Sequence, residues 1–303
     1  MRIVLHGQQA FGQAVLEKLL ERGENVVAVC CAPTNEGKSE DVLAIHAREK
    51  GLPVHQPASW KTSEALALME SFEADICMMA YVLLFVPEAV LNAPKYGTFQ
   101  YHPSLCPLHR GPSSINWPIA MGKDRTGLSI FWPDDGLDEG PIMLQKTCSI
   151  GPDETLGDVY FKKLFPMGVD AMLEGLDLVK SGVIIKHDQR LDVGTYEGWF
   201  GKKEAELDWS ASVSDVYNTI RAANPAPGAW TKIQGQELKI YDSTRVDGTG
   251  IPGEVVSVSD KGLTVQANGG RILIERVRAD EGKVPASQWA NKAGITAGMK
   301  LGQ

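Results

Sequence analysis

Residues 1–31 constrain the fold more than any other segment of this chain. They read MRIVLHGQQAFGQAVLEKLLERGENVVAVCC: an apolar run, a glycine, a stretch with Phe11, Val15 and Leu19 at helical spacing, another glycine and a second apolar run. This order predicts a strand, a helix and a second, parallel strand. We therefore expect an α/β fold whose mostly parallel, Rossmann-like sheet has helices on both faces.

Later segments repeat this alternation. Further strands are predicted at Ala74–Ala80, Gly97–Tyr101 and Leu128–Trp132. Helices are predicted near Ser63–Phe72, Pro87–Leu91 and Ser113–Met121, followed by a long one at Thr155–Lys180. Ligands of such sheets bind beyond the carboxyl ends of the strands, so the loops at those ends are the first candidates for a site.

The composition changes near the C-terminal third of the chain. After a helix predicted at Ser212–Ala223, five short alternating pieces follow, each bounded by Gly, Asp or Asn: AWTKIQG, QELKIYDS, GEVVSVSD, KGLTVQANG and RILIERVR. Short strands at this spacing predict a small OB-like β-barrel, with a split sheet as the alternative. The predicted organisation is an α/β domain at 1–184, a linker at 185–204 and the OB-like domain at 205–303.

Charge and cysteine content narrow the class of protein. A net charge of -8 and a pI near 5.3 argue against general affinity for phosphate backbones or anionic membranes. The longest uncharged apolar stretch, Ile76–Val86, is too short to cross a bilayer. The five scattered cysteines show no zinc spacing and are typical of reduced thiols, so we expect a cytoplasmic protein acting on small molecules, with no membrane partner.

The first glycine turn does not support a nicotinamide cofactor. Gly7 and Gly12 give G-x-x-x-x-G rather than G-x-G-x-x-G, and the second strand ends at Cys30–Pro33 with no acidic residue for a ribose hydroxyl. We expect a glycine turn that lets the helix pack closely on the strand, and no NAD(P).

Two loops carry the residues suited to catalysis. HPSLCPLHRG (His102–Gly111) follows one predicted strand, and PDDGLDEGP (Pro133–Pro141) follows another. If both leave carboxyl ends of strands at one edge, an imidazole and a carboxylate meet in one cleft and can carry out acyl-type chemistry. The D-D-x-x-D-E spacing lacks the alternating ligands of a calcium loop, so no metal is expected. Cys106 is expected to pack rather than to act as a nucleophile.

These motifs resemble a known family. QYHPSLCPLHRGPSSINW (Gln100–Trp117) and GLSIFWPDDGLDEGPIMLQ (Gly127–Gln145) are similar to the folate-dependent formyltransferases and hydrolases, most of all to the hydrolase domain of 10-formyltetrahydrofolate dehydrogenase. TYEGWFGKKEAELDW (Thr195–Trp209) fits that hydrolase domain too, while IRAANPAPGAW and the C-terminal segment are similar to methionyl-tRNA formyltransferase. The aldehyde dehydrogenase domain of the larger relative has no counterpart here, so we expect no NADP chemistry.

The resemblance implies a formyltransferase domain at 1–184, with 10-formyltetrahydrofolate as formyl donor and a catalytic trio of Asn, His and Asp. His102 and Asp138 match the histidine and the aspartate, whereas Gln100 holds the asparagine position, which is not asparagine in the hydrolase-type relatives either. Pterin recognition in the family uses backbone groups of two loops. The matching residues here are Leu84, Phe85, Val86, Pro87, Asp134, Asp135, Gly136 and Leu137.

Three functions fit these residues. The favoured one passes the formyl group of 10-formyltetrahydrofolate to water or an amine, with a sugar nucleotide as one further acceptor. The second is methionyl-tRNA formyltransferase, which has a basic loop where PTNEGKSED (Pro33–Asp41) has one lysine against three acidic residues; basic residues of the barrel nevertheless leave a tRNA surface open. These are Lys232, Lys239, Arg271, Arg276 and Arg278. The third, a catalytically silent folate-binding module, is disfavoured because His102 and Asp138 are retained.

Overall fold

The computed structural model describes residues 1–34, 37, 39–279 and 282–302. The chain divides into two compact units. Unit 1 comprises Met1–Gly111, Gly127–Cys148 and Lys163–Tyr196, and unit 2 comprises Pro112–Thr126, Ser149–Lys162 and Glu197–Gln303. The domain boundaries at 184 and 204 stay predictions.

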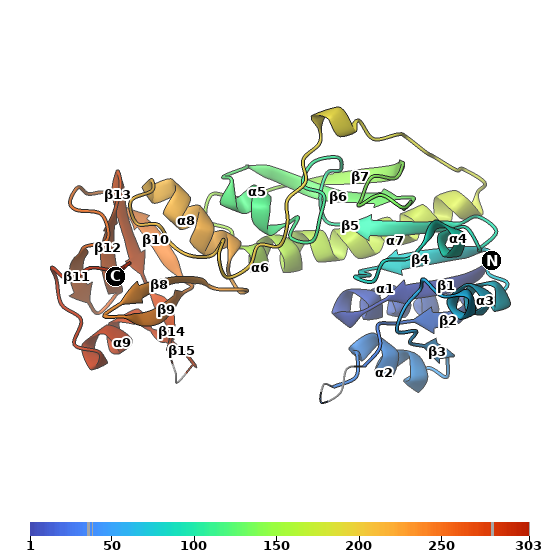
Figure 1. Ribbon diagram of the computed structural model, residues 1–303, viewed down its shortest axis with the longest axis horizontal. Coiled ribbons are helices and arrows are strands. Elements are labelled where there is room, and N and C mark those ends of the chain that lie inside the picture. Colours follow the sequence, from blue (N-terminus) through green and yellow to red (C-terminus); the bar gives the residue numbers. More distant parts are fainter. Residues whose placement is uncertain (35–36, 38, 280–281, 303) are drawn as a thin grey trace. The chain divides into compact units, whose positions relative to one another are not determined.

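A seven-stranded sheet in the order β3-β2-β1-β4-β5-β6-β7 forms the centre of unit 1 (Figure 1). Its strands are β1 (Arg2–Gly7), β2 (Asn25–Cys30), β3 (Val54–His55), β4 (Ile76–Ala80), β5 (Thr98–His102), β6 (Arg125–Phe131) and β7 (Ile142–Ser149). Strands β1 to β5 pair in parallel, which confirms the predicted mostly parallel sheet. The sequence did not predict β3 or β7.

Helices cover both faces of this sheet. The helices of unit 1 are α1 (Gln9–Glu21), α2 (Val42–Glu49), α3 (Ser63–Ser71), α4 (Glu88–Leu91) and α7 (Phe165–Lys180), with a 3-10 turn η2 (Leu191–Val193). On one face, Phe11 of α1 stacks on Tyr101 of β5 with ring centroids 4.3 Å apart, and α7 packs against both residues at Gly168. On the other face, Met69 of α3 and Val90 of α4 share a buried cluster with strand side chains.

Strand β5 points its polar side chains away from α7. Because side chains alternate along a strand, Gln100 and His102 lie on the face opposite Phe99 and Tyr101. Thr98 on the same face donates a hydrogen bond of 2.7 Å from its hydroxyl to the carbonyl of Leu91 in α4. The sheet itself therefore gives Gln100 and His102 a common side.

The prediction that the two candidate loops leave one edge of the sheet is wrong, because β6 runs antiparallel to β5. In the observed register His102 lies opposite Ser129 and Gln100 lies opposite Phe131. An apolar run such as LSIFW has the same pattern in either direction. The loop after β6 therefore starts near Gln100 and has to fold back to approach His102.

The predicted long helix consists of three consecutive pieces: α6 (Leu156–Val159), a π-helical turn η1 (Tyr160–Leu164) and α7. Thr155 and Asp158 form a capping box at its start, in which each side chain bonds the backbone N–H of the other residue. The predicted span of Thr155–Lys180 is thus helical almost throughout.

Among the described residues, unit 2 combines four helices with two four-stranded sheets in the orders β10-β13-β12-β11 and β15-β14-β9-β8. The helices, besides α6, are α5 (Asn116–Ala120), α8 (Val213–Ala222) and α9 (Ala286–Lys292), and the strands are β8 (Ala229–Ile233), β9 (Gln236–Ile240), β10 (Ser243–Val246), β11 (Val255–Ser259), β12 (Gly262–Ala267), β13 (Gly270–Ile274), β14 (Arg276–Ala279) and β15 (Gly282–Pro285). The chain thus has the predicted β-rich C-terminal part. RILIERVR, however, breaks at Glu275 into two strands of different sheets, and β10 and β15 were not predicted.

Within the described ranges, no helix is both long and apolar enough to cross a membrane.

Candidate active site

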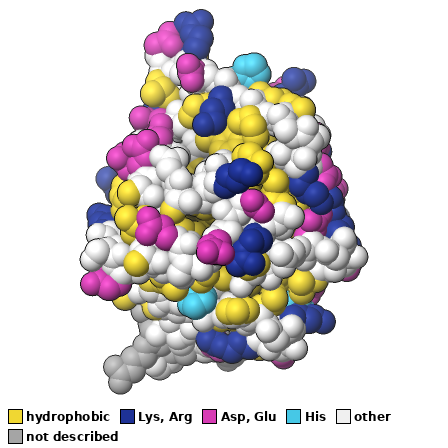
Figure 2. All heavy atoms as spheres, turned by 90° about the vertical axis from the view of Figure 1, so that its right-hand side faces the viewer, with side chains coloured by type: hydrophobic (Ala, Val, Ile, Leu, Met, Phe, Trp, Pro, Cys, Tyr) yellow, Lys and Arg dark blue, Asp and Glu magenta, His cyan; other side chains and the backbone are white. Residues whose placement is uncertain are grey.

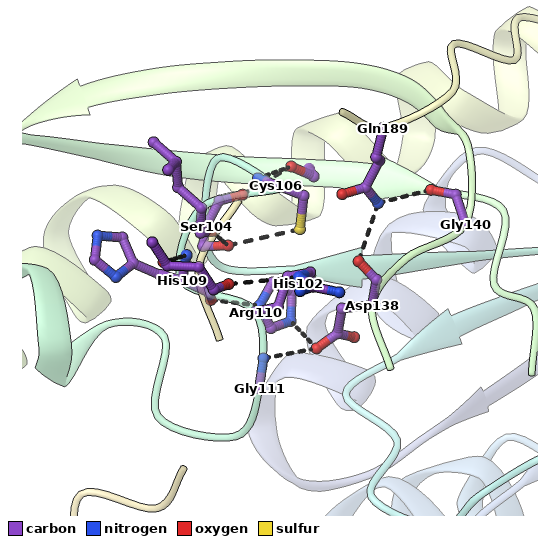
Figure 3. A network of polar contacts seen from close by, with 12 residues as sticks. His102, Ser104, Cys106, His109, Arg110, Gly111, Asp138, Gly140 and Gln189 are labelled. Carbon is purple, nitrogen blue, oxygen red and sulfur yellow. Dashed lines mark hydrogen bonds and ion pairs between the residues drawn. The ribbon is translucent and has the colours of Figure 1, made fainter. Parts of the chain in front are cut away.

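His102 is the last residue of β5 and is only 7% exposed. Its Nε2 lies 3.2 Å from the carbonyl oxygen of His109, and its Nδ1 lies 3.6 Å from Oδ2 of Asp138 (Figure 3). A carbonyl and a carboxylate are both hydrogen-bond acceptors, so each ring nitrogen faces an acceptor. The ring is therefore oriented from two sides.

Asp138 reaches His102 from the acid loop, residues 132–141. The base of this loop is closed by a hydrogen bond of 2.9 Å from the backbone N–H of Trp132 to the carbonyl of Pro141. Asp138 has φ 57°, in the left-handed region that Asp tolerates better than most residues. Its Oδ2 also accepts a hydrogen bond of 2.9 Å from the backbone N–H of Gly111. One carboxylate oxygen of Asp138 thus contacts both His102 and Gly111.

The histidine loop, residues 103–111, is held in shape by polar side chains of β6 and β7. The Ser129 hydroxyl donates to the carbonyl of Ser104 at 2.8 Å and accepts from the backbone N–H of Cys106 at 3.0 Å. Gln145 donates to the carbonyl of Cys106 at 2.8 Å. Burial raises the pKa of the Cys106 thiol to about 11, so at neutral pH it is not a thiolate nucleophile.

A second ion pair joins the same two loops. Arg110 of the histidine loop pairs with Glu139 of the acid loop, next to the pair formed by His102 and Asp138. The Arg110 side chain is only 12% exposed, which favours a lasting contact over a transient surface pair. The histidine loop and the acid loop are thus joined at adjacent positions.

Gln100 is half-buried on β5, between Met79 of β4 and Phe131 of β6. It precedes His102 by two residues, so both side chains lie on one face of the strand. The amide is therefore available next to the imidazole on the side of the sheet that the site uses.

The two predicted folate loops are joined by a hydrogen bond. The Asp135 carboxylate accepts from the backbone N–H of Glu88, the first residue of α4, at 3.1 Å. Asp134 accepts from the backbone N–H of Gly136 at 2.9 Å, which forms a tight turn. The predicted folate-binding residues differ in exposure. The side chains of Phe85 and Leu137 are exposed, whereas that of Val86 is buried in the core cluster.

Sequence reasoning missed a segment that contacts both loops, which we name the strap (residues 185–196). Gln189 donates to the carbonyls of Asp138 and Gly140 in the acid loop. Thr195 bonds the histidine loop, donating from its backbone N–H to the carbonyl of Pro107 at 3.0 Å and accepting at its carbonyl from the backbone N–H of Arg110 at 3.1 Å. These residues lie in the predicted linker; Thr195 begins the motif TYEGWFGKKEAELDW, whereas Gln189 carries no sequence signal.

Gly140 at the end of the acid loop leaves no room for a side chain. A Cβ at this position would lie 1.8 Å from the carbonyl oxygen of Trp132. We expect Gly140→Ala to lower the free energy of unfolding by about 1–3 kcal/mol through this backbone clash, as measured by urea denaturation. Gly198→Ala is the matched control because nothing lies within 4 Å of its Cβ position. Equal stability of the two variants would contradict the expectation.

No cluster of three or more His, Cys, Asp or Glu side chains suited to a metal ion occurs among the residues that the structure describes.

Comparisons with known proteins show which family the chain belongs to. Residues 1–173 match the formyl transferase family, and residues 200–294 match the formyl transferase C-terminal domain. The first match covers more than half of the 303 residues. The chain therefore belongs to the formyl transferase family.

Two relatives illustrate the range of this family. The mitochondrial 10-formyltetrahydrofolate dehydrogenase of Homo sapiens is 36% identical over 305 residues, which cover 95% of this chain and 33% of that protein. The chain thus spans about a third of the length of this relative. The methionyl-tRNA formyltransferase of Geotalea daltonii is 33% identical over 308 residues, which cover 100% of this chain and 98% of that protein.

Solved structures share the fold. HypX from Aquifex aeolicus in complex with tetrahydrofolic acid matches with a TM-score of 0.68 and 19% identity, over 96% of this chain and 47% of that one. The N-formyltransferase from Helicobacter canadensis, in complex with folinic acid and dTDP-3-aminofucose, matches with a TM-score of 0.67 and 16% identity, over 93% and 99%.

Proposed function

We propose that this chain removes the formyl group from 10-formyltetrahydrofolate and passes it to water or to an amine. The observation that carries this proposal is the contact of 3.6 Å between His102 Nδ1 and Asp138 Oδ2, whose side chains are only 8% and 11% exposed. An imidazole and a carboxylate in one sheltered place are the groups that acyl transfer needs.

The proposed reaction assigns one role to each polar group. Water or an amine attacks the formyl carbon and gives up a proton to the Asp138 carboxylate. Protonated His102, aided by the Gln100 amide, donates to the formyl oxygen as it becomes negative. The bond from the formyl carbon to N10 then breaks, and N10 takes up the proton that Asp138 accepted, which restores the carboxylate. With water as acceptor the products are formate and tetrahydrofolate.

We propose the two joined loops as the folate site. The backbone of residues 84–87 and 134–137 would bind the pterin, and the hydrogen bond from Glu88 N–H to Asp135 supports a fixed spacing between them. A flat heterocycle suits a slot bounded by two loops of fixed spacing. No metal ion and no NAD(P) take part in the proposed reaction.

Methionyl-tRNA formyltransferase is the second candidate, favoured by the relative that matches over its full length. Several basic residues of unit 2 have partners within the chain: Arg276 Nε lies 3.0 Å from Asp242, Arg271 donates to Gln266 at 3.1 Å, and Lys239 donates to a backbone carbonyl at 3.2 Å. Acidic and basic side chains are also interspersed on the face shown in Figure 2, which is the right-hand side of Figure 1, where α3 and α4 of unit 1 lie. These features weaken the attraction to phosphates, so we favour water or a small amine.

The loop Pro33–Asp41, on which the comparison with tRNA-modifying relatives rests, includes residues 35, 36 and 38, which lie outside the described residues. Its charge balance is a property of the sequence alone. A catalytically silent folate-binding module is the least favoured function, since it would not need the sheltered pair formed by His102 and Asp138.

The acceptor is tested by incubating the purified protein with 10-formyltetrahydrofolate and following tetrahydrofolate by absorbance. The first arm has no acceptor, the second has small amines or amino sugar nucleotides, and the third has charged initiator tRNA. Turnover in the first or second arm supports the proposal. Turnover that needs tRNA would establish the second candidate, and no turnover in any arm would establish the third.

Gln100→Ala is expected to slow turnover without abolishing it. Removing one donor to an oxyanion costs on the order of 10²-fold in kcat where that donor is the main one, and His102 remains as the stronger, charged donor. We therefore expect a loss on the order of tenfold in steady-state kcat, well short of the effect at His102. Gln100→Asn, which restores an amide, tests the extra methylene. If Gln100→Ala were as inactive as His102→Ala, Gln100 would not be the auxiliary donor that we propose.

We propose an OB-like fold for the β-rich C-terminal part and a cytoplasmic location. The location is supported by five cysteines that form no disulfide.

A further inference from the structure

The strap carries one side chain into the acid loop. Gln189 donates from Nε2 to the carbonyl oxygens of Asp138, at 3.0 Å, and of Gly140, at 2.7 Å (Figure 3). Its Oε1 is buried and has no hydrogen-bond partner among the described residues. The side chain of Gln189 therefore acts only as a hydrogen-bond donor. Its NH2 group bonds the backbone carbonyls of the two residues that flank Glu139.

The backbone that Gln189 holds is not one that the chain would adopt unaided. Asp138 lies in the left-handed region at φ 57°, and Gly140 is in close contact with the Trp132 carbonyl. The direction of the Asp138 side chain depends on these dihedral angles. Releasing the two carbonyls would let the carboxylate turn away from His102.

The strap itself is anchored, so the amide does not simply follow the loop. The backbones of His187 and Ile142 exchange two hydrogen bonds of 2.8 and 3.0 Å at the start of β7. The indole N–H of Trp132 donates to the carbonyl of Ile185 at 2.8 Å. Gln189 therefore projects from a fixed segment that is paired with the sheet edge.

We infer that Gln189 is a positioning residue, which fixes the direction in which Asp138 faces His102 and touches no substrate itself. The inference rests on the proposed function for its effect on turnover. Its geometric part, the dependence of the His102 environment on Gln189, can be measured without turnover.

Two variants of Gln189 separate this role from mere packing. Gln189→Met keeps the size and removes both donors, and we expect kcat for deformylation to fall on the order of 10-fold to 100-fold while tetrahydrofolate binds as in the wild type. In Gln189→Glu the carboxylate faces two carbonyls, whereas its protonated form regains one donor. The ratio of its kcat to that of the wild type should therefore rise as pH falls from about 8 to about 5.5.

The geometric readout is NMR of the His102 imidazole. Its ring resonances should shift in Gln189→Met and stay in place in the control Gln236→Glu, an exposed glutamine in unit 2. Thermal unfolding of each variant shows whether it is folded.

The possible outcomes distinguish positioning of Asp138 by Gln189 from packing alone. Unchanged His102 resonances and unchanged kcat in Gln189→Met would overturn the inference. So would a loss of kcat that parallels loss of thermal stability, with a flat pH ratio for Gln189→Glu, because that result indicates packing alone. A wild type without turnover but with a His102 shift in Gln189→Met would overturn the proposed function and leave the positioning role standing.

Discussion

His102→Ala is expected to lower kcat for deformylation of 10-formyltetrahydrofolate by on the order of 10³-fold or more. The imidazole lies 3.6 Å from Asp138, and in the proposed reaction its removal leaves the developing oxyanion with the Gln100 amide at most. The neighbouring Arg110 cannot replace the imidazole, because its side chain is paired with Glu139. Steady-state release of tetrahydrofolate, followed by absorbance, measures the loss.

The matched control for His102→Ala is His187→Ala. The His187 imidazole is exposed and only its backbone pairs with Ile142, so alanine at this position keeps the observed contacts. Tetrahydrofolate binding should be similar in both variants, because the proposed folate slot is made of backbone from other residues. Retention of more than about a tenth of the wild-type kcat in His102→Ala would exclude the catalytic role.

The sequence predicted the central architecture because its signals are local. Phe11, Val15 and Leu19 at helical spacing between two apolar runs require a strand, a helix and a parallel strand, whatever follows. The β-rich C-terminal part was recognised for a similar reason, from short alternating runs with turn residues between them. Strands such as STRV of β10 and GKVP of β15 were missed because they contain too few apolar residues to stand out from loops.

The sequence predicted that His102 and Asp138 lie close together, but not the path of the chain that brings them there. His102 and Asp138 were paired on the assumption of a shared strand edge, and the structure brings them together by a different route, with β6 reversed and the acid loop folded back. Strand direction depends on pairing partners far along the chain, which an apolar run does not encode. The same limit explains Gln189, whose two bonds reach residues 51 and 49 positions away.

The strap gives the site a feature that neither loop provides alone. The histidine loop contacts the strap at Thr195, the acid loop contacts it at Gln189, and the two loops also contact each other through Arg110 and Glu139. Three backbone segments are thus mutually restrained around one imidazole and one carboxylate. Such preorganisation means that little rearrangement is needed when charge develops in the proposed reaction.

Asp138→Asn is the sharpest test of the carboxylate. Asparagine has nearly the same shape, tolerates the left-handed φ of 57° and can still accept from the N–H of Gly111. What it loses is the negative charge 3.6 Å from the His102 ring and, in the proposed reaction, the ability to take a proton from water or an amine. We expect kcat to fall by on the order of 10² to 10⁴-fold with folate binding retained, measured by the same absorbance assay. Asp138→Ala, which also loses the contact with Gly111, should be at least as inactive.

The control for this substitution is Asp170→Asn on the exposed surface of α7, which makes the same change of charge away from the site. If Asp138→Asn kept full activity, the proton would have to leave the attacking water or amine by another group. In that case Asp138 would serve only to hold Gly111 and the loop backbone, since the asparagine oxygen can still accept that bond. Comparing Asn with Ala at one position therefore separates the chemical role of the carboxylate from its structural one.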